Sequence, residues 1–280
     1  MKSLIYGMGI SGKSAAKYLE EKKDNFVVFD DKVDIEKYEK WNKDFSGIKR
    51  IIVSPGIPPS NKILKEAESL KIPIYCDIGL ASYEKNLPQI IAVTGTAGKS
   101  TLVSLLADIL NLSGKKTIAL GNYGLSPLEV IDSNYEFWVI EVSSFQAKRL
   151  GKLKPNIAVY LNFSQNHLDW HKTIKDYKVS KSLLFKSQDS QDLRIVNKNI
   201  EKKYILGNAR EKTIKQNKFS RIREDIHQET LSVIGTCIEE LNLNKDIAKK
   251  AIQDFTTLMH RYEKVNTNDG IQWINDSKAT

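Results

Sequence analysis

A short glycine-rich loop over residues 94–101 lies between a β-branched apolar run and a leucine-rich segment. The run over 90–93 predicts a buried strand, and residues 102–112 predict a helix. A strand, a glycine loop and a helix in this order are the context of a phosphate-binding loop. There, backbone N–H groups and the helix N-terminus hold phosphate oxygens. The sequence therefore predicts a nucleoside triphosphate site within an α/β fold.

The loop itself reads Gly-Thr-Ala-Gly-Lys-Ser-Thr at residues 95–101. It is shorter than the usual G-x-x-x-x-G-K-[ST] spacing, because Val93 stands where the first glycine is expected. Lys99 can reach the outer phosphates of a nucleotide, and the hydroxyl of Ser100 is placed to ligate Mg²⁺. The other ATP contacts expected in the loop are Gly95, Thr96, Ala97, Gly98 and Thr101.

A second glycine motif lies near the N-terminus. Residues 3–7 predict a strand that leads into Gly-Met-Gly-Ile-Ser-Gly at 7–12. A strand over 26–29 ends at Asp30 and Asp31, about 20 positions further on, as in dinucleotide-binding folds. The motif indicates that a phosphate or ribose binds at this helix N-terminus, and it does not identify the molecule.

Strands and helices alternate along the chain, which favours parallel, doubly wound sheets. Glu141 ends a buried strand predicted over 137–140, where such proteins place a carboxylate that reaches Mg²⁺. The predicted fold is α/β, with a Rossmann-like domain over 1–87 and a P-loop-type ATP-binding domain over 88–275, both with mostly parallel sheets. Further elements expected are helices over 14–22, 35–45, 226–241 and 245–256, and a hairpin or short strands over 193–197 and 203–206.

Two histidines, His167 and His171, follow a strand predicted over 156–161, with an aspartate between them. Their spacing permits metal ligation, although a histidine in such a place can equally form ordinary hydrogen bonds. Lys181 shares a helix face with two aromatic residues. Such a lysine can have a lowered pKa or can extend its charged end to solvent, and both interpretations stay open.

The net charge of +9 results from 43 basic and 34 acidic residues. The lysines are scattered along predicted exposed faces without a block of arginines and aromatics, so we expect a solvated surface and no nucleic-acid partner. No apolar run approaches the ~20 residues that cross a bilayer. The two cysteines match no metal or redox spacing. We expect a cytoplasmic monomer that does not bind membranes.

Taken together, the motifs resemble those of the Mur ligase family along the whole chain. Besides the two glycine motifs, the landmarks are Ser-Pro-Gly-Ile-Pro at 54–58, Gly-Asn-Tyr-Gly at 121–124, Glu-Val-Ser-Ser-Phe-Gln at 141–146, Asn-His-Leu-Asp at 166–169, His-Arg-Tyr-Glu at 260–263 and Asn-Asp-Ser-Lys-Ala-Thr at 275–280. The motifs at 54–58 and 141–146 favour the glutamate-adding branch. The resemblance implies an ATP-dependent ligase of peptidoglycan precursor synthesis, which joins D-glutamate to UDP-N-acetylmuramoyl-L-alanine through an acyl phosphate.

The resemblance also implies roles for individual residues. The catalytic residues would be Lys99, Glu141, His167 and Lys181. One Mg²⁺ would be held by Ser100 and Glu141, and a second by His167 and a carbamylated Lys181. Further ATP contacts would be Arg261 and Asp276. The UDP substrate would contact Gly9, Ser11, Gly12, Asp30, Asp31, Ser54, Asn122, His167, Lys278 and Thr280.

Members of this family have three domains, and residues 276–280 resemble the beginning of the third. We therefore expect this chain to lack a C-terminal domain and to bind its substrates without completing the ligation. Two alternatives remain. The first glycine motif and Asp30 allow an NAD-dependent oxidoreductase, and a chain without the third domain could be a non-catalytic nucleotide-binding module.

Overall fold

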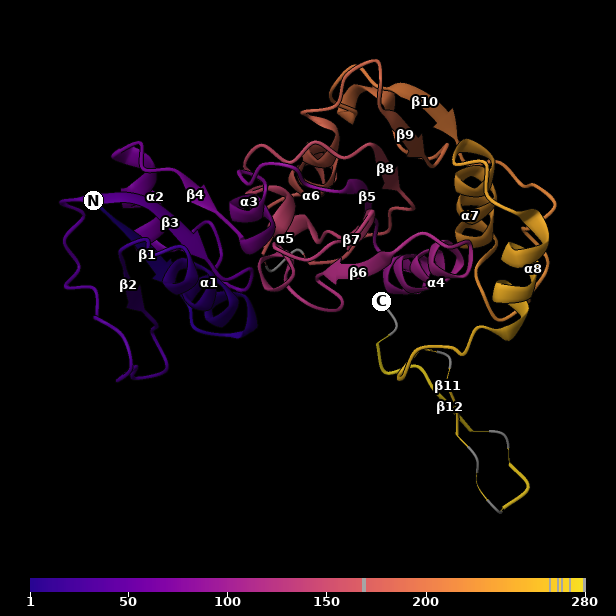
Figure 1. Ribbon diagram of the computed structural model, residues 1–280, viewed down its shortest axis with the longest axis horizontal. Helices are drawn as coiled ribbons and strands as arrows, with labels where there is room; N and C mark the ends of the chain where they lie inside the picture. Colours follow the sequence, from indigo (N-terminus) through magenta and orange to yellow (C-terminus); the bar gives the residue numbers. More distant parts are fainter. Residues whose placement is uncertain (168–169, 262, 266, 268, 272, 279–280) are drawn as a thin grey trace.

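The computed structural model describes residues 1–167, 170–261, 263–265, 267, 269–271 and 273–278. Two sheets form two lobes, and a small hairpin projects from the second lobe (Figure 1). The strands of the first sheet lie in the order β2-β1-β3-β4, and those of the second in the order β10-β9-β8-β5-β7-β6. Every strand pair in these two sheets is parallel. The α/β class predicted from the alternating pattern is confirmed.

The first lobe consists of β1 (Lys2–Tyr6), α1 (Ile10–Glu21), β2 (Phe26–Phe29), β3 (Ile48–Val53), α2 (Lys62–Ser69) and β4 (Ile74–Tyr75). Successive side chains of a strand point to opposite faces of its sheet. Ile5 of β1 accordingly packs with Leu19 of α1, whereas Leu4 packs with Leu64 of α2. Both faces of the sheet are therefore covered, as is usual for parallel sheets.

The helix predicted over residues 35–45 is wrong. Residues 39–41 run beside β2, where the N–H of Val28 donates to the carbonyl of Glu39 and that of Trp41 donates to the carbonyl of Val28. Trp41 is buried, with its ring 5.7 Å from that of Phe29 and 4.9 Å from that of Phe45. The free edge of β2 and these aromatic contacts hold residues 39–41 extended, and this tertiary context outweighs helical propensity, which decides little by itself.

The chain crosses from the first lobe to the second through the short helix α3 (Asp77–Ala81). Ile78 packs in the core of the second lobe, and Leu80 packs in that of the first. A Cβ at Gly79 would lie 2.0 Å from the carbonyl oxygen of Arg149, so only glycine permits this close approach. Because α3 contributes to both cores, it holds the lobes together. The domain limits at residues 87 and 275 stay predictions.

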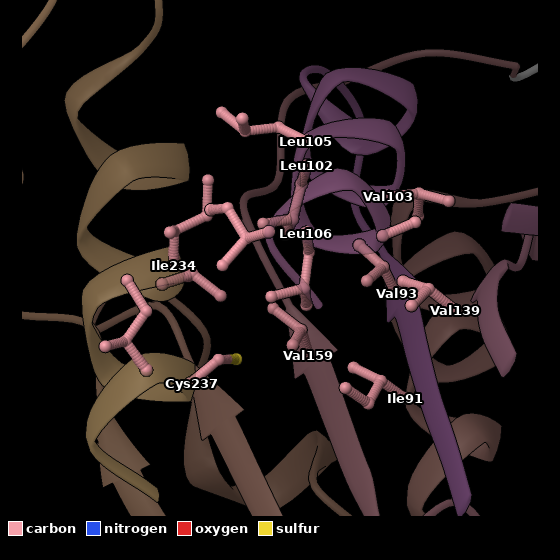
Figure 2. Packing of buried hydrophobic residues seen from close by; sticks show 14 of the residues in the cluster. Ile91, Val93, Leu102, Val103, Leu105, Leu106, Val139, Val159, Ile234 and Cys237 are labelled. Atoms are coloured by element: carbon pink, nitrogen blue, oxygen red, sulfur yellow. The ribbon is translucent and has the colours of Figure 1, made fainter. Parts of the chain in front are cut away.

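The second lobe consists of β5 (Gln89–Thr94), α4 (Lys99–Leu112), β6 (Thr117–Gly121), the 3₁₀ turn η1 (Pro127–Glu129), β7 (Phe137–Glu141), α5 (Ser144–Ala147), β8 (Ile157–Tyr160), α6 (Ile174–Ser182), η2 (Leu183–Phe185), β9 (Leu193–Val196), η3 (Lys202–Tyr204), β10 (Arg210–Thr213), α7 (Gln228–Glu240) and α8 (Lys245–Asp254). Helices α4, α7 and α8 cover one face of its sheet, and α3, α5 and η2 contribute to the other. Figure 2 shows Leu106 of α4 among Val159 of the sheet and Ile234 of α7. This packing fixes the helix that follows the glycine loop.

Of the hairpin or short strands predicted over 193–197 and 203–206, the first strand is confirmed as β9 and the second is wrong. Residues 202–204 form a 3₁₀ turn, and the strand that follows β9 is β10, which pairs with it in parallel. A parallel partner requires a crossover connection, and Ile200 and Ile205 in this crossover pack into the core. Beyond α8, β11 (Glu263–Val265) and β12 (Trp273–Asn275) form the projecting antiparallel hairpin. No helix within the described ranges has the length and apolar character needed to cross a bilayer.

Candidate nucleotide-binding site

The glycine loop joins β5 to α4 at the carboxyl end of the second sheet, where β5 lies between β7 and β8. Gly98 caps α4 with a φ of +77°, a conformation that glycine adopts without strain. The first N–H groups of a helix have no partner within it, and they carry the positive end of the helix dipole. The loop therefore has the backbone shape and the potential of a phosphate site.

Asn162, at the end of β8, holds the loop in shape, and the sequence analysis missed it. Its Oδ1 accepts the N–H groups of Thr96 and Ala97, both at 3.0 Å. Its Nδ2 donates to Glu229 of α7 at 3.4 Å, and Glu229 also accepts a hydrogen bond from Asn197 at 2.7 Å. The one available signal was an amide directly after a predicted buried strand, since carboxyl ends of parallel strands meet at one edge. No spacing rule connects residue 162 with the loop.

Ser100 and Glu141 meet beside the loop, as the sequence predicted. The hydroxyl of Ser100 donates to Oε2 of Glu141 at 2.6 Å, and Nδ2 of Asn122 donates to Oε1 at 2.8 Å. Glu141 is buried at the end of β7. Hydroxyl and carboxylate oxygens are ligands that Mg²⁺ prefers, so this buried pair fits a magnesium site.

Two lysines flank the loop: Lys99 is half-buried and Lys181 is buried. Nζ of Lys99 donates to the carbonyl of Thr96 at 3.0 Å, and Nζ of Lys181 donates to that of Gly95 at 2.6 Å. Burial lowers the pKa of Lys99. Burial and the charge of Lys99 lower the pKa of Lys181 well below its usual value, against the opposing effect of Glu141. With 2% of Lys181 exposed, the structure decides against the alternative that this side chain extends to solvent.

His167 is exposed and adopts a left-handed backbone conformation with a φ of +54°. Its ring centroid lies 5.0 Å from that of Phe145 and 6.0 Å from that of Tyr177. Nζ of Lys181 lies 4.6 Å from the same Tyr177 ring. His167 and Lys181, which the family resemblance implies as ligands of a second Mg²⁺, therefore both lie beside the ring of Tyr177. Leu168 and Asp169 of this motif lie outside the described residues.

His171, in contrast, is fully buried. Its Nδ1 lies 2.9 Å from the carboxylate of Asp176, and its Nε2 lies 2.9 Å from the hydroxyl of Ser144. Burial lowers the pKa of His171, although Asp176 opposes this effect. Because both ring nitrogens are occupied, His171 has none to offer a metal, so this half of the metal-ligand hypothesis is wrong. Across the described ranges, no group of three histidine, cysteine, aspartate or glutamate side chains is suited to hold a metal ion.

A cavity of about 330 Å³ opens beside the loop. Its lining includes Gly98, Thr101, His227, Thr230, Arg261, Asp276 and Lys278. Nη2 of Arg261 reaches the hydroxyl of Ser100 at 2.9 Å. Both Arg261 and Asp276 were predicted to contact ATP, and Lys278, implied as a contact of the UDP substrate, lines the same cavity. Thr280 lies outside the described residues.

The remaining residues predicted to bind the UDP substrate gather at the carboxyl ends of β1, β2 and β3. The hydroxyl of Ser54 donates to the carbonyl of Gly7 at 2.8 Å, and the carboxylate of Asp31 accepts the hydroxyl of Tyr6 at 2.5 Å. Asp30 accepts the N–H of Met8 at 2.7 Å. Although burial opposes it, this and two further backbone N–H groups hold the pKa of Asp30 below its usual value. Gly9, Ser11 and Gly12 form the adjoining start of α1, whereas Asn122 lies in the other lobe, beside Glu141.

Comparison with known proteins agrees with this arrangement. The Mur ligase middle domain matches residues 93–258. The UDP-N-acetylmuramoylalanine–D-glutamate ligases of Aquifex aeolicus and Thermosipho africanus are 34% and 37% identical to this chain. Both alignments include all of this chain, and they include 71% and 72% of the lengths of the two ligases. The crystal structure of the UDP-N-acetylmuramate–alanine ligase of Thermotoga maritima has a TM-score of 0.54 at 14% identity, over 99% of this chain and 74% of that one.

The two parallel sheets and the glycine loop beside the buried Ser100–Glu141 pair fit a nucleotide-binding α/β protein, and the family match identifies an ATP-dependent ligase. The chain belongs to the Mur ligase family. Ligases of this family use ATP and Mg²⁺. The oxidoreductase alternative is not favoured, because it accounts for neither the second glycine loop nor the family match.

Proposed function

We propose that this chain is a ligase that joins D-glutamate to UDP-N-acetylmuramoyl-L-alanine with the hydrolysis of ATP. The observation that carries the proposal is the hydrogen bond of 2.6 Å between Ser100, at the start of the loop helix, and the buried carboxylate of Glu141. Support for the particular substrates comes from relatives named as UDP-N-acetylmuramoylalanine–D-glutamate ligases. We expect the protein to act as a cytoplasmic monomer without nucleic-acid or membrane partners.

The residues around the loop would bind and neutralise the triphosphate. Lys99 and the N–H groups at the start of α4 would hold the β- and γ-phosphates, while Arg261 would approach from the cavity side. Ser100 and Glu141 would hold Mg²⁺, which offsets the negative charge of the phosphates. The substrate carboxylate attacks the γ-phosphate and displaces ADP. The amine of D-glutamate then displaces phosphate from the acyl phosphate, so the protein's main task is positioning.

We further propose that Lys181 is carbamylated and, with His167, holds a second Mg²⁺. Its buried position and lowered pKa favour the neutral amine, whose lone pair attacks CO₂ to form a carbamate as one proton leaves. The carbamate places an anionic oxygen donor beside Lys99, and this is a ligand type suited to Mg²⁺. Its proximity to the glycine loop, through the carbonyl of Gly95, supports this assignment.

The first lobe would bind the uridine diphosphate part of the substrate. Gly9, Ser11 and Gly12 lie at the N-terminus of α1, next to Asp30 and Ser54. Helix N-termini attract phosphate oxygens. Asn122 and His167 would face the muramoyl part, and Lys278 and Thr280 would complete the substrate contacts. Asn122 is already bonded to the Glu141 carboxylate, so its position couples the substrate site to the magnesium site.

Calorimetric titration with UDP-N-acetylmuramoyl-L-alanine, Mg·ATP and NADH tests the proposed binding. We expect the first two to bind and NADH not to bind. Phosphate release that depends on D-glutamate tests the reaction, and it distinguishes the proposed ligase from a chain that binds its substrates without completing the ligation. For the carbamate, ¹³C-bicarbonate should produce a new NMR signal that Lys181→Met removes. Tight NADH binding without any response to Mg·ATP would contradict the proposal.

A further inference from the structure

Three side chains in the second lobe form a continuous chain of hydrogen bonds, which is buried at Ser144 and His171 and half-buried at Asp176. Ser144 Oγ lies 2.9 Å from Nε2 of His171, and Nδ1 of His171 lies 2.9 Å from Oδ2 of Asp176. Asp176 also accepts Nζ of Lys148, at 2.7 and 3.0 Å. Ser144 is 2% exposed and His171 is fully buried.

This is the bonding order of a serine–histidine–aspartate triad. A nucleophilic role is excluded here, because a serine with 2% exposure cannot meet a substrate. The carboxylate of Asp176 accepts a hydrogen bond from Nδ1–H, so Nε2 is the unprotonated nitrogen and accepts a hydrogen bond from the hydroxyl of Ser144. Both ring nitrogens of His171 are thus saturated by the protein itself, so the group acts as a structural link.

The link joins three segments that each carry a residue of the site. Ser144 begins α5, directly after the strand that ends at Glu141. His171 closes the loop of His167, to whose carbonyl its own N–H donates at 2.8 Å. Asp176 lies in the first turn of α6, the helix that carries Lys181. Ring contacts of His171 with Phe145 and with Tyr177, at 5.7 and 4.9 Å, tie the same segments together.

Helix α6 in turn touches the glycine loop at two points. Nζ of Lys181 donates to the carbonyl of Gly95 at 2.6 Å, and the hydroxyl of Tyr177 lies 3.4 Å from that of Thr96. A shift of the first turn of α6 would therefore move the side chains that support the loop. Outer partners that orient a site typically change its affinity 10–100-fold when removed.

We propose that His171 is a positioning residue for the nucleotide site, which it stabilises by holding α6 against the glycine loop. It touches neither nucleotide nor metal and acts through Asp176 and Ser144. The inference rests on the proposed function only in that Mg²⁺ with ATP is the ligand of this loop. It assigns to His171 a role different from that of His167, four residues earlier.

The test measures two quantities on the full 280-residue chain. Calorimetry gives the affinity for Mg·AMPPNP, a non-hydrolysable ATP analogue, and urea unfolding gives the unfolding midpoint. His171→Phe keeps a ring for the stacking contacts and loses both hydrogen bonds. His171→Asn keeps a donor for Asp176, and Ser144→Ala removes one bond with little risk to folding. We expect the affinity to fall about tenfold in His171→Phe and by less in the other two variants.

Gln188→Leu is the matched control. Gln188 is buried and donates to the carbonyls of Pro155 and Leu193, at the opposite end of the same sheet from the loop. This variant also loses two buried hydrogen bonds, so we expect a lower unfolding midpoint with unchanged affinity for Mg·AMPPNP.

Unchanged affinity in folded His171→Phe, or in Ser144→Ala if that variant alone folds, would overturn the inference and leave the proposed function intact. An equal loss of affinity in Gln188→Leu would also overturn it, because general destabilisation would then explain the effect. If the unaltered protein itself fails to bind Mg·AMPPNP, both the proposed function and the inference fall.

Discussion

The two lobes carry the same six-residue pattern at the same kind of position. Gly-Ile-Ser-Gly-Lys-Ser at 9–14 follows β1, and Gly-Thr-Ala-Gly-Lys-Ser at 95–100 follows β5. In each pattern the final serine donates to a glutamate, Ser14 to Glu129 at 2.9 Å and Ser100 to Glu141 at 2.6 Å. The sequence predicts a triphosphate site at the second pattern and a dinucleotide-type turn, without an identified ligand, at the first.

The helix begins at a different place in the two patterns. α1 is capped by the first glycine, Gly9, so Lys13 lies one turn inside the helix and is exposed. α4 is capped by the second glycine, Gly98, so Lys99 is its first residue and is held at the loop. We infer that this pattern suits a triphosphate only when the helix starts at the lysine of the pattern. The free N–H groups of the first turn and the ammonium group then lie on the same side of the loop.

The charges at the two turns differ as well. In the first lobe the carboxylate of Asp30 accepts the N–H of Met8, whereas in the second the neutral amide of Asn162 accepts those of Thr96 and Ala97. A carboxylate beside a turn disfavours a densely charged triphosphate and tolerates a hydroxyl-bearing ligand. The first turn accordingly suits a nucleoside diphosphate sugar, and the second suits ATP.

The largest effect that separates the turns should come from their second glycines. A Cβ at Gly12 would lie 2.0 Å from the carbonyl oxygen of Gly7, so Gly12→Ala should cost about 3 kcal/mol of unfolding free energy. Gly98→Ala meets looser contacts, the closest at 3.0 Å, and its positive φ should cost about 1–2 kcal/mol. Urea unfolding measures both. If Gly98→Ala proves the more destabilising, the packing difference between the turns is misread.

Removal of the lysine should affect one turn alone. At a hundredfold excess over its dissociation constant, Mg·ATP should stabilise the protein by about 2.7 kcal/mol, and Lys99→Ala should abolish this gain. Lys13→Ala, at the equivalent place in the first pattern, is the control and should keep it. Thermal melts with and without Mg·ATP measure the difference. Equal behaviour of the two variants would contradict the assignment of the triphosphate to the second loop.

The two serine–glutamate pairs provide a smaller and more specific contrast. Glu141→Gln removes the charge implied at the magnesium, and we expect the affinity for Mg·ATP to fall at least tenfold, which is about 1.4 kcal/mol. Chelation of Mg²⁺ with EDTA should lower ATP affinity in the unaltered protein and have little further effect in this variant. Glu129→Gln is the matched change in the first lobe and should retain the full response to Mg²⁺.

The smallest effect concerns pH and Lys181. Because its pKa is lowered in the folded protein, Lys181 binds fewer protons there than in the unfolded chain, so its contribution to stability rises with pH. It should rise from the lowered pKa up to about 10.4, the usual lysine value. Lys181→Met removes this term. In CO₂-free, Mg²⁺-free buffer, the unfolding free energy of Lys181→Met should exceed that of the unaltered protein most at neutral pH, and the difference should shrink toward pH 10. Lys13→Met is the control.

Local sequence predicted well what depends on neighbouring residues. The apolar run over 90–93 became β5, the leucine-rich segment became α4, and Ser100 and Glu141 met because parallel strands bring their carboxyl ends to one edge. It failed for residues 35–45, whose extended form depends on the edge of β2 and on the ring of Phe29. Asn162 was missed for the same reason, because it contacts a loop 65 residues away.

The sequence by itself determined two strand–turn–helix units and the α/β class, and it predicted the residues that would hold a triphosphate and a magnesium ion. Those features follow from side-chain periodicity and from the conformational freedom of glycine, which act over a few positions. Only the tertiary structure decided where the helix begins in each of the two patterns and which of the two histidines is buried. The burial of His171 and its contact with Ser144, 27 residues earlier in the chain, depend on the packing of separate segments, and no local pattern encodes them.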